Sequence, residues 1–128
     1  MHDDDDEEIR RFHKECFVAN LTEVQKIIEE KKSDSSFTIL VNRPETLFYI
    51  INGEANSEDK KALLSYLSKA DLQLKKDNLL DLNMNKGFAL EIAVQKDDIS
   101  LIQYLMNNGV KMDSQVLKIQ GYLFVLKL

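Results

Sequence analysis

His13 and Cys16 are the residues whose types and spacing come closest to a reactive pair. They lie three positions apart, a spacing that places two side chains on the same face of a helix. An imidazole in that position could take the proton of the thiol and leave a nucleophilic thiolate. A thiol enzyme also needs a group that orients the imidazole and donors for an oxyanion, and no residue pattern marks either of these. We therefore predict no catalysis, with Cys16 buried as a small apolar residue.

The residues that could bind metals are too few for a metal centre. The chain has two His and one Cys, and His2 lies beside the acidic run of residues 3–8, so there is no spaced set of ligands. The acidic run lacks the glycine and the distant glutamate of a calcium loop. A glycine-rich phosphate loop is also missing. We predict no metal and no cofactor, and we interpret residues 1–8 as a flexible acidic tail that improves solubility or steers a basic partner.

The charge balance argues against nucleic acid as a partner. Seventeen Lys and Arg residues stand against 22 Asp and Glu, which gives a net charge of −5. The tail contributes six of the acidic groups, so the remaining chain is nearly neutral, and its longest basic clusters are pairs such as Lys31-Lys32. No apolar run approaches the roughly 18 residues of a membrane span. With a single cysteine and an acidic start unlike a signal peptide, the sequence favours a cytoplasmic protein.

Composition and apolar spacing predict an all-α protein with one domain, residues 9–128. Four Gly and one Pro are too few for the many turns of a barrel or sandwich. Apolar residues that recur every three or four positions indicate three pairs of short helices: 9–18 with 21–32, 44–52 with 57–67, and 88–94 with 99–106. Asn20, Ser57 and Asp98 are the expected caps of the second helix in each pair. The sequence does not decide the secondary structure of residues 33–42 and 71–82.

Residues 87–113 resemble an ankyrin repeat, a unit of about 33 residues. The stretch Phe88-Ala89-Leu90-Glu91-Ile92-Ala93-Val94 stands where the family has Thr-Pro-Leu-His-x-Ala-Ala on its inner helix, and Asp97-Asp98 stands at its Gly-His turn. Leu101-Ile102 and Leu105-Met106 stand at the two apolar pairs of the outer helix, before Gly109. Residues 12–30 look like a more divergent copy, and residues 46–70 look like a third copy whose turn has an insertion of about four residues.

This resemblance implies a short solenoid of stacked helix-turn-helix hairpins with capping helices at residues 9–18 and 113–128. Members of the family bind other proteins through the turns and the inner helices. Carried over position by position, the resemblance implies a partner-binding surface that contains eight residues: Phe17, Val18, Arg43, Glu45, Met84, Asn85, Gln95 and Lys96. We expect a protein partner of unidentified kind. For Phe17, burial in the core is an equally good interpretation, and for the polar residues solvated surface is the alternative.

Two other functions are compatible with the sequence. The C-terminal segment is very apolar, with Tyr122 to Leu126 and Leu128 together, so the chain could be a structural protein or fragment that assembles with another copy of itself. In that case it would be a weak homo-oligomer rather than a monomer. A thiol enzyme is the third hypothesis, and it predicts rapid alkylation of Cys16 near neutral pH. A regulator, or an effector delivered into the cytoplasm of a host, would fit the binding function.

Overall fold

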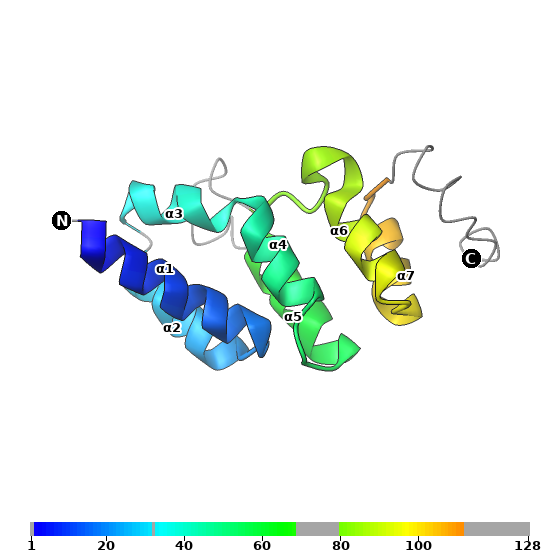
Figure 1. The fold of residues 1–128 in the computed structure, drawn as a ribbon, viewed down its shortest axis with the longest axis horizontal. Coiled ribbons are helices and arrows are strands. Elements are labelled where there is room, and N and C mark those ends of the chain that lie inside the picture. The colour runs from blue at the N-terminus through cyan, green and yellow to red at the C-terminus, as the bar shows by residue number, and fades with distance from the viewer. Residues whose placement is uncertain (1, 32, 69–79, 112–128) are drawn as a thin grey trace.

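All regular secondary structure in residues 2–31, 33–68 and 80–111, which are the residues described by the computed structural model, is α-helical (Figure 1). The expectation of an all-α protein is therefore confirmed. In chain order, the helices are α1 (His2–Phe17), α2 (Leu21–Lys31), α3 (Ser35–Val41), α4 (Pro44–Ile51), α5 (Ser57–Ser68), α6 (Met84–Gln95) and α7 (Ile99–Asn107).

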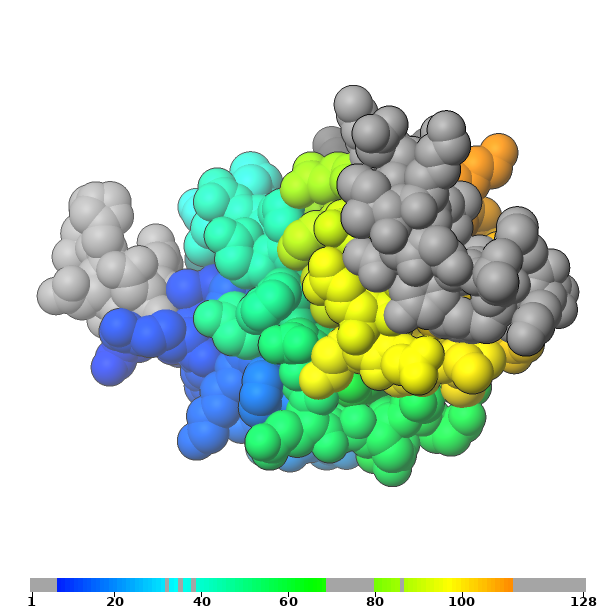
Figure 2. Space-filling view, turned by 45° about the vertical axis from the view of Figure 1, so that its right-hand side comes forward, coloured from blue at the N-terminus to red at the C-terminus, as the bar shows by residue number. Residues whose placement is uncertain are grey.

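Six of the helices form pairs that lie side by side. A short turn joins α1 to α2, α4 to α5, and α6 to α7, and the pairs follow one another along the long axis of the molecule (Figure 1). Helices α1, α4 and α6 contact one another in succession and make one layer, called here the inner layer. Helices α2, α5 and α7 make the outer layer in the same way. The space-filling view shows the same order, with α1 beside α4 and α5, and these beside α6 and α7 (Figure 2).

The core lies between the two layers and consists of the apolar stripes that the sequence predicts. Residues from every helix pair are at most 3% exposed: Phe12, Cys16, Val24, Ile27, Ile28, Leu47, Ile50, Ile51, Leu63, Leu64, Leu90, Ala93, Leu101, Ile102 and Leu105. Burial of this kind stabilises a fold by roughly 1.5–3 kcal/mol for each large side chain. Met106, which stands at one of the apolar pairs of the outer helix, is 38% exposed and lies outside this core. Phe48 and Ile99 are also exposed, at 41% and 47%.

The three outer-layer helices of the pairs begin with the same cap. The backbone N–H groups of Glu23, Asp59 and Leu101 donate to the side chains of Asn20 (3.2 Å), Asn56 (2.8 Å) and Asp98 (3.1 Å). Each bond satisfies an N–H group that has no partner within its helix.

The expected caps Asn20 and Asp98 are confirmed, and the expected cap Ser57 is wrong. Ser57 is the first residue of α5, so its neighbour Asn56 occupies the capping position and accepts the bond. The Ser57 hydroxyl instead donates to the carboxylate of Asp98 at 2.8 Å, across to the next helix pair.

The turns of the first and third pairs have matching backbones. Ala19 and Asp97 both adopt a left-handed conformation, with φ of 51° and 58°, which is uncommon outside glycine. The middle turn is longer by two residues, not by the expected four. It consists of residues 52–56, whereas the turns of the first and third pairs consist of residues 18–20 and 96–98.

Several boundaries differ from the expected ones. Helix α1 begins at His2, so it includes most of the stretch for which the sequence predicts a tail, and acidic residues suit the positive end of a helix. Residues 35–41, whose form the sequence leaves open, make α3, which Asp34 caps through the N–H groups of Ser36 and Phe37. Helix α6 begins at Met84 rather than at residue 88. Residues 71–79 and the expected C-terminal cap at 113–128 lie outside the described residues.

No helix within the described ranges has the length and apolar character needed to cross a bilayer.

Candidate functional site

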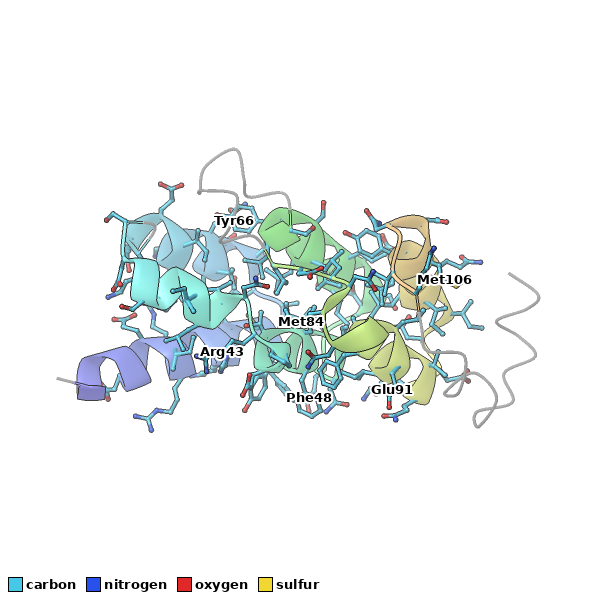
Figure 3. All side chains as sticks on the ribbon, turned by 90° about the horizontal axis from the view of Figure 1, so that it is seen from above. Arg43, Phe48, Tyr66, Met84, Glu91 and Met106 are labelled. Atoms are coloured by element: carbon cyan, nitrogen blue, oxygen red, sulfur yellow. The ribbon has the colours of Figure 1, made fainter. Side chains whose placement is uncertain are left out.

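The eight residues predicted to bind a partner fall into two groups at opposite ends of the inner-layer helices. One group lies where α1 and α6 end and their turns begin, and it contains Phe17, Val18, Gln95 and Lys96. The other group lies where α4 and α6 begin, and it contains Arg43, Glu45, Met84 and Asn85. Arg43 and Met84 lie at these helix starts in the view from above (Figure 3). The structure thus does not bring the eight residues into one cluster, and within the first group α4 lies between the end of α1 and the end of α6 (Figure 1).

Six of these eight side chains are exposed. Val18 is 48% exposed, a large value for an apolar residue, and the five exposed polar or charged residues are Arg43, Glu45, Asn85, Gln95 and Lys96. Phe17 and Met84 are half-buried. Phe17 is therefore neither a core residue nor a fully solvated one.

Phe48 lies between the two groups, on the open side of α4, and is a residue that the sequence analysis does not select. Its ring is 41% exposed and meets the ring of Tyr49 edge-on at 5.8 Å. Phe48 and Glu91 point out of the inner layer on the same side of the molecule (Figure 3). The sequence gives no clear signal for this exposure, because Phe48 stands in an apolar run in which Leu47 and Ile50 are buried.

We use the name inner face for the open side of the inner layer together with the adjoining turns. Its exposed apolar residues are Phe48 of α4 and Val18 in the turn after α1. Three half-buried aromatic residues, Phe17, Tyr49 and Phe88, also belong to the inner-layer helices. Charged residues of both signs, among them Lys14, Glu45, Glu91 and Lys96, lie on the same helices and turns. A surface of this composition can bury apolar side chains of another molecule and pair with charges of either sign.

His13 and Cys16 do not form an exposed reactive pair. Cys16 is fully buried, and its pKa is raised above the usual range, first by burial and then by the carboxylate of Glu15. The ring of His13 stacks on Tyr49 with a centroid separation of 4.8 Å, which joins α1 to α4. Burial lowers the pKa of His13 below its ordinary value of 6.5, although the carboxylate of Glu45 opposes the shift. Both side chains therefore favour their neutral forms and pack between helices.

Cys16 is expected to resist alkylation while the protein is folded. A buried thiol with a raised pKa supplies little thiolate and gives a reagent no access, so reaction must wait for the helix pair to open. The rate with iodoacetamide at mildly alkaline pH should be at least about 100-fold lower in the folded protein than in urea. Reaction in the folded protein at the rate of the unfolded chain would contradict this placement of Cys16 and support the thiol-enzyme hypothesis.

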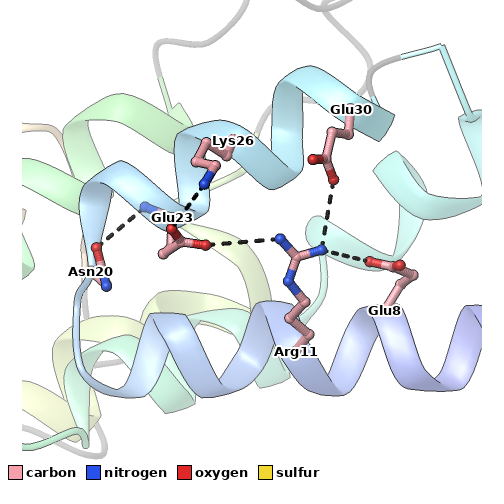
Figure 4. A network of polar contacts seen from close by, with 6 residues as sticks. All are labelled: Glu8, Arg11, Asn20, Glu23, Lys26 and Glu30. Carbon is pink, nitrogen blue, oxygen red and sulfur yellow. Dashed lines mark hydrogen bonds and ion pairs between the residues drawn. The ribbon is translucent and has the colours of Figure 1, made fainter.

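Within the first helix pair, a network of charged groups joins α1 to α2 (Figure 4). The guanidinium nitrogens of Arg11 lie 3.3 Å from a carboxylate oxygen of Glu8, 3.8 Å from one of Glu23 and 3.6 Å from one of Glu30. The Nζ of Lys26 lies 3.3 Å from the other carboxylate oxygen of Glu23. The Arg11 side chain is 39% exposed, so each pair contributes at most about 1 kcal/mol of stability. The network has the composition of a solvated surface and lacks a recognisable nucleophile or general base.

Lys60 is the buried charged residue of the second helix pair. It is only 4% exposed, and its Nζ donates a hydrogen bond of 2.7 Å to the backbone carbonyl of Ile51. Burial lowers the pKa of Lys60; the carboxylate of Asp98 opposes this shift, and the charge of Lys96 adds to it. Lys60 thus ties α5 to the end of α4.

In the described part of the chain, the inner face exposes two large apolar side chains, Val18 and Phe48, among charged residues of both signs. Among residues 2–31, 33–68 and 80–111, no group of three or more His, Cys, Asp or Glu side chains could hold a metal ion. A shallow hollow over α1 is lined by charges of both signs: Glu7, Glu8, Arg10, Arg11 and Lys14. Comparisons of the chain with protein-family models, with curated proteins and with solved structures found no significant match.

Proposed function

We propose that this chain is a divergent ankyrin-like solenoid of three stacked helical hairpins and that its inner face binds a protein partner without catalysis. The stacking is supported by the recurrence of one arrangement: each pair has an inner-layer helix, a short turn, and an Asn or Asp that caps the outer-layer helix. In repeat proteins of this kind, each unit buries its apolar surface against its neighbours and leaves one extended face open for binding.

The exposure of Phe48 and Val18 is the main observation that supports the proposed binding function. These side chains are 41% and 48% exposed on the same layer, and no described residue covers them. Burial of one large apolar side chain in a complex gains roughly 1.5–3 kcal/mol. Aromatic residues surrounded by polar ones are also the usual anchors of protein interfaces.

Mixed charge around these residues favours a protein over the other partner classes. Arg43 and Lys96 are balanced by Glu45 and Glu91, so the face has no basic stripe of the kind that binds nucleic acid. A polypeptide offers both apolar side chains and charges of either sign. The cytoplasm is the proposed compartment, on the basis of the single cysteine.

A comparison of two single variants tests the binding function. Phe48→Asp would place a charge at the centre of the inner face, whereas Ile39→Asp makes the same kind of change on α3, where Ile39 is 56% exposed. A partner should be identified by capture with the unaltered chain, and its affinity should then be measured with each purified variant. We expect Phe48→Asp to weaken binding at least about 30-fold, which corresponds to a loss of about 2 kcal/mol of binding free energy at an interface anchor. Ile39→Asp should leave the affinity unchanged.

Charge reversal at the two ends of the inner face extends this test. Arg43→Glu and Lys96→Glu change exposed residues and should alter the affinity less than Phe48→Asp does, since charges at the rim of an interface contribute little. If all three variants bind as tightly as the unaltered chain, the binding surface lies elsewhere. Circular dichroism of each variant establishes that its helices are intact.

Self-assembly is the second candidate function. It is favoured by Ile99 and Met106, which lie seven residues apart on α7 and are 47% and 38% exposed. Two apolar residues with this spacing share one side of a helix and could pair with a second copy. Sedimentation equilibrium over a wide range of protein concentration distinguishes the two candidate functions. A monomeric mass at every concentration would exclude self-assembly.

A further inference from the structure

The rings of His13, Tyr49 and Phe48 form a chain that leads from the contact between α1 and α4 to the inner face. His13 stacks on Tyr49 with a centroid separation of 4.8 Å and an interplanar angle of 27°. Tyr49 in turn meets the exposed ring of Phe48 edge-on at 5.8 Å. The contact between the first two helix pairs therefore includes one titratable ring, which is half-buried.

The Nε2 atom of His13 is buried and has no hydrogen-bond partner among the described residues. In a neutral imidazole only one of the two ring nitrogens donates, whereas in a charged imidazolium both of them do. The charged ring would thus place an N–H group and part of a positive charge where no acceptor lies. A buried donor without an acceptor is unfavourable, and it is more so when it carries charge.

We propose that His13 makes the contact between the first and second helix pairs sensitive to acid, so that uptake of a proton by its ring weakens the attachment of α1 to α4. The neutral ring packs against Phe12 and Tyr49, with centroid separations of 5.8 and 4.8 Å. The charged ring is hydrated only when α1 moves away from α4, and this hydration favours the open form. The inference concerns the free chain and does not depend on the binding of a partner.

The nearest charges do not replace the missing acceptor. Glu45 of α4 is the carboxylate that favours the charged form of His13, but burial is the larger effect and lowers the pKa of the ring. The Glu45 side chain is exposed, so water and salt screen its attraction. On α1 itself, Arg10 and Lys14 lie within one turn of His13. Both have the same sign as the charged ring and offer it no attraction.

The other carboxylates on the elements packed against α1 have partners of their own. Glu23 and Glu30 of α2 pair with Arg11. Helix α3 has no titratable side chain, and the carboxylate of Asp34 before it accepts bonds from the first N–H groups of that helix. A proton on His13 therefore adds a charge to this contact without a paired carboxylate.

The lowered pKa gives the direction of the pH dependence. Because the pKa of His13 in the folded protein lies below its ordinary value of 6.5, the unfolded chain takes up this proton first as the pH falls. The stability that the neutral ring contributes is therefore fully present above pH 6.5. It is lost as the pH falls from that value through the pKa of the folded protein.

Two measurements on the full chain test the effect of this ring on stability. Followed by NMR, the titration of His13 should have a lower midpoint in the folded protein than in urea. When the pH is lowered from about 7.5 to about 5, the equilibrium constant of unfolding should rise at least about threefold more in the unaltered chain than in His13→Phe. Phenylalanine keeps an aromatic ring against Tyr49 but cannot take up a proton. The matched control His2→Gln removes the other histidine of the chain and should keep the full pH dependence.

The reactivity of Cys16 shows whether α1 takes part in the opening. Cys16 lies three residues after His13 on α1 and is fully buried. Dithiodipyridine, which reacts with thiols in acid, should label Cys16 at about pH 5 at least about threefold faster in the unaltered chain than in His13→Phe, with each rate taken relative to the same chain in urea.

Three results would overturn the proposal. They are a midpoint of His13 in the folded protein at or above that in urea, an equal pH dependence of the unaltered chain and His13→Phe, and a loss of the pH dependence in His2→Gln. The NMR titration uses the unaltered chain, so it remains decisive if His13→Phe does not fold. No partner is present in these measurements, so their outcome is independent of the binding test at Phe48.

Discussion

Lys60→Glu is expected to destabilise the fold by about 3–5 kcal/mol, which is the usual consequence of leaving an uncompensated charge in a protein interior. The new carboxylate would face the carbonyl oxygen of Ile51, which now accepts a hydrogen bond from Lys60. It would also lie near the carboxylate of Asp98, whose attraction for a cation becomes repulsion. In thermal unfolding followed by circular dichroism, Tm should fall by roughly 10 °C or more.

Two further variants separate the burial of Lys60 from its charge. Lys111→Glu makes the same charge change at an exposed residue and should shift stability by less than about 0.5 kcal/mol. Lys60→Met keeps the length of the side chain and places an apolar group where the first and third pairs have the buried Val24 and Ile102. A buried charge replaced by an apolar group of similar volume often changes stability little, so this variant should remain folded. Equal effects of Lys60→Glu and Lys111→Glu would show that Lys60 is solvated.

Gly53→Ala is expected to destabilise the fold by about 2–3 kcal/mol through overpacking. A Cβ atom at Gly53 would overlap the carbonyl oxygen of Phe17 and lie 2.8 Å from that of Tyr49. Both are backbone atoms, so no side chain can rotate away. The same Phe17 carbonyl accepts a hydrogen bond from the N–H of Glu54 at 3.2 Å. A methyl group would therefore push α4 away from the end of α1, and urea unfolding should show the loss of stability.

Gly109→Ala is the control for this prediction. Gly109 has a left-handed φ of 84°, and a Cβ atom there would meet nothing within 4 Å. Gly109→Ala therefore tests the left-handed backbone conformation without a steric clash. It should lower the free energy of unfolding by about 1 kcal/mol. A loss at Gly53 no larger than that at Gly109 would mean that the close approach of α1 and α4 is not as the structure shows.

The sequence predicts the local features of this fold well. The helix pairs, the all-α class, and the caps Asn20 and Asp98 follow from apolar spacing and from capping residues, both of which act over a few neighbouring positions. Ser57 was the wrong cap because two adjacent residues, Asn56 and Ser57, are both good capping residues. Choosing between them requires knowledge of Asp98 in the next pair, to which the Ser57 hydroxyl is bonded.

Burial that depends on distant residues could not be predicted in the same way. Lys60 looks like part of an exposed basic pair, and its burial depends on the Ile51 carbonyl nine residues away and on the Asp98 carboxylate. Phe48 and Leu47 are adjacent apolar residues of one helix, and only the contacts of α4 with its neighbours decide which of them is buried. For the candidate site, the resemblance to a repeat family indicates positions at both ends of the inner-layer helices but not the exposed ring between them.

Asp98 has two hydrogen-bond donors from different pairs, and this couples their folding. Its carboxylate caps α7 through the N–H of Leu101 and accepts the hydroxyl proton of Ser57 from the pair before. When the second pair unfolds, the first turn of α7 loses the contact that orients its cap, so nucleation of that helix becomes less favourable. Local melting at one end is thus transmitted along the chain, and the domain should unfold in a single cooperative transition rather than one hairpin at a time.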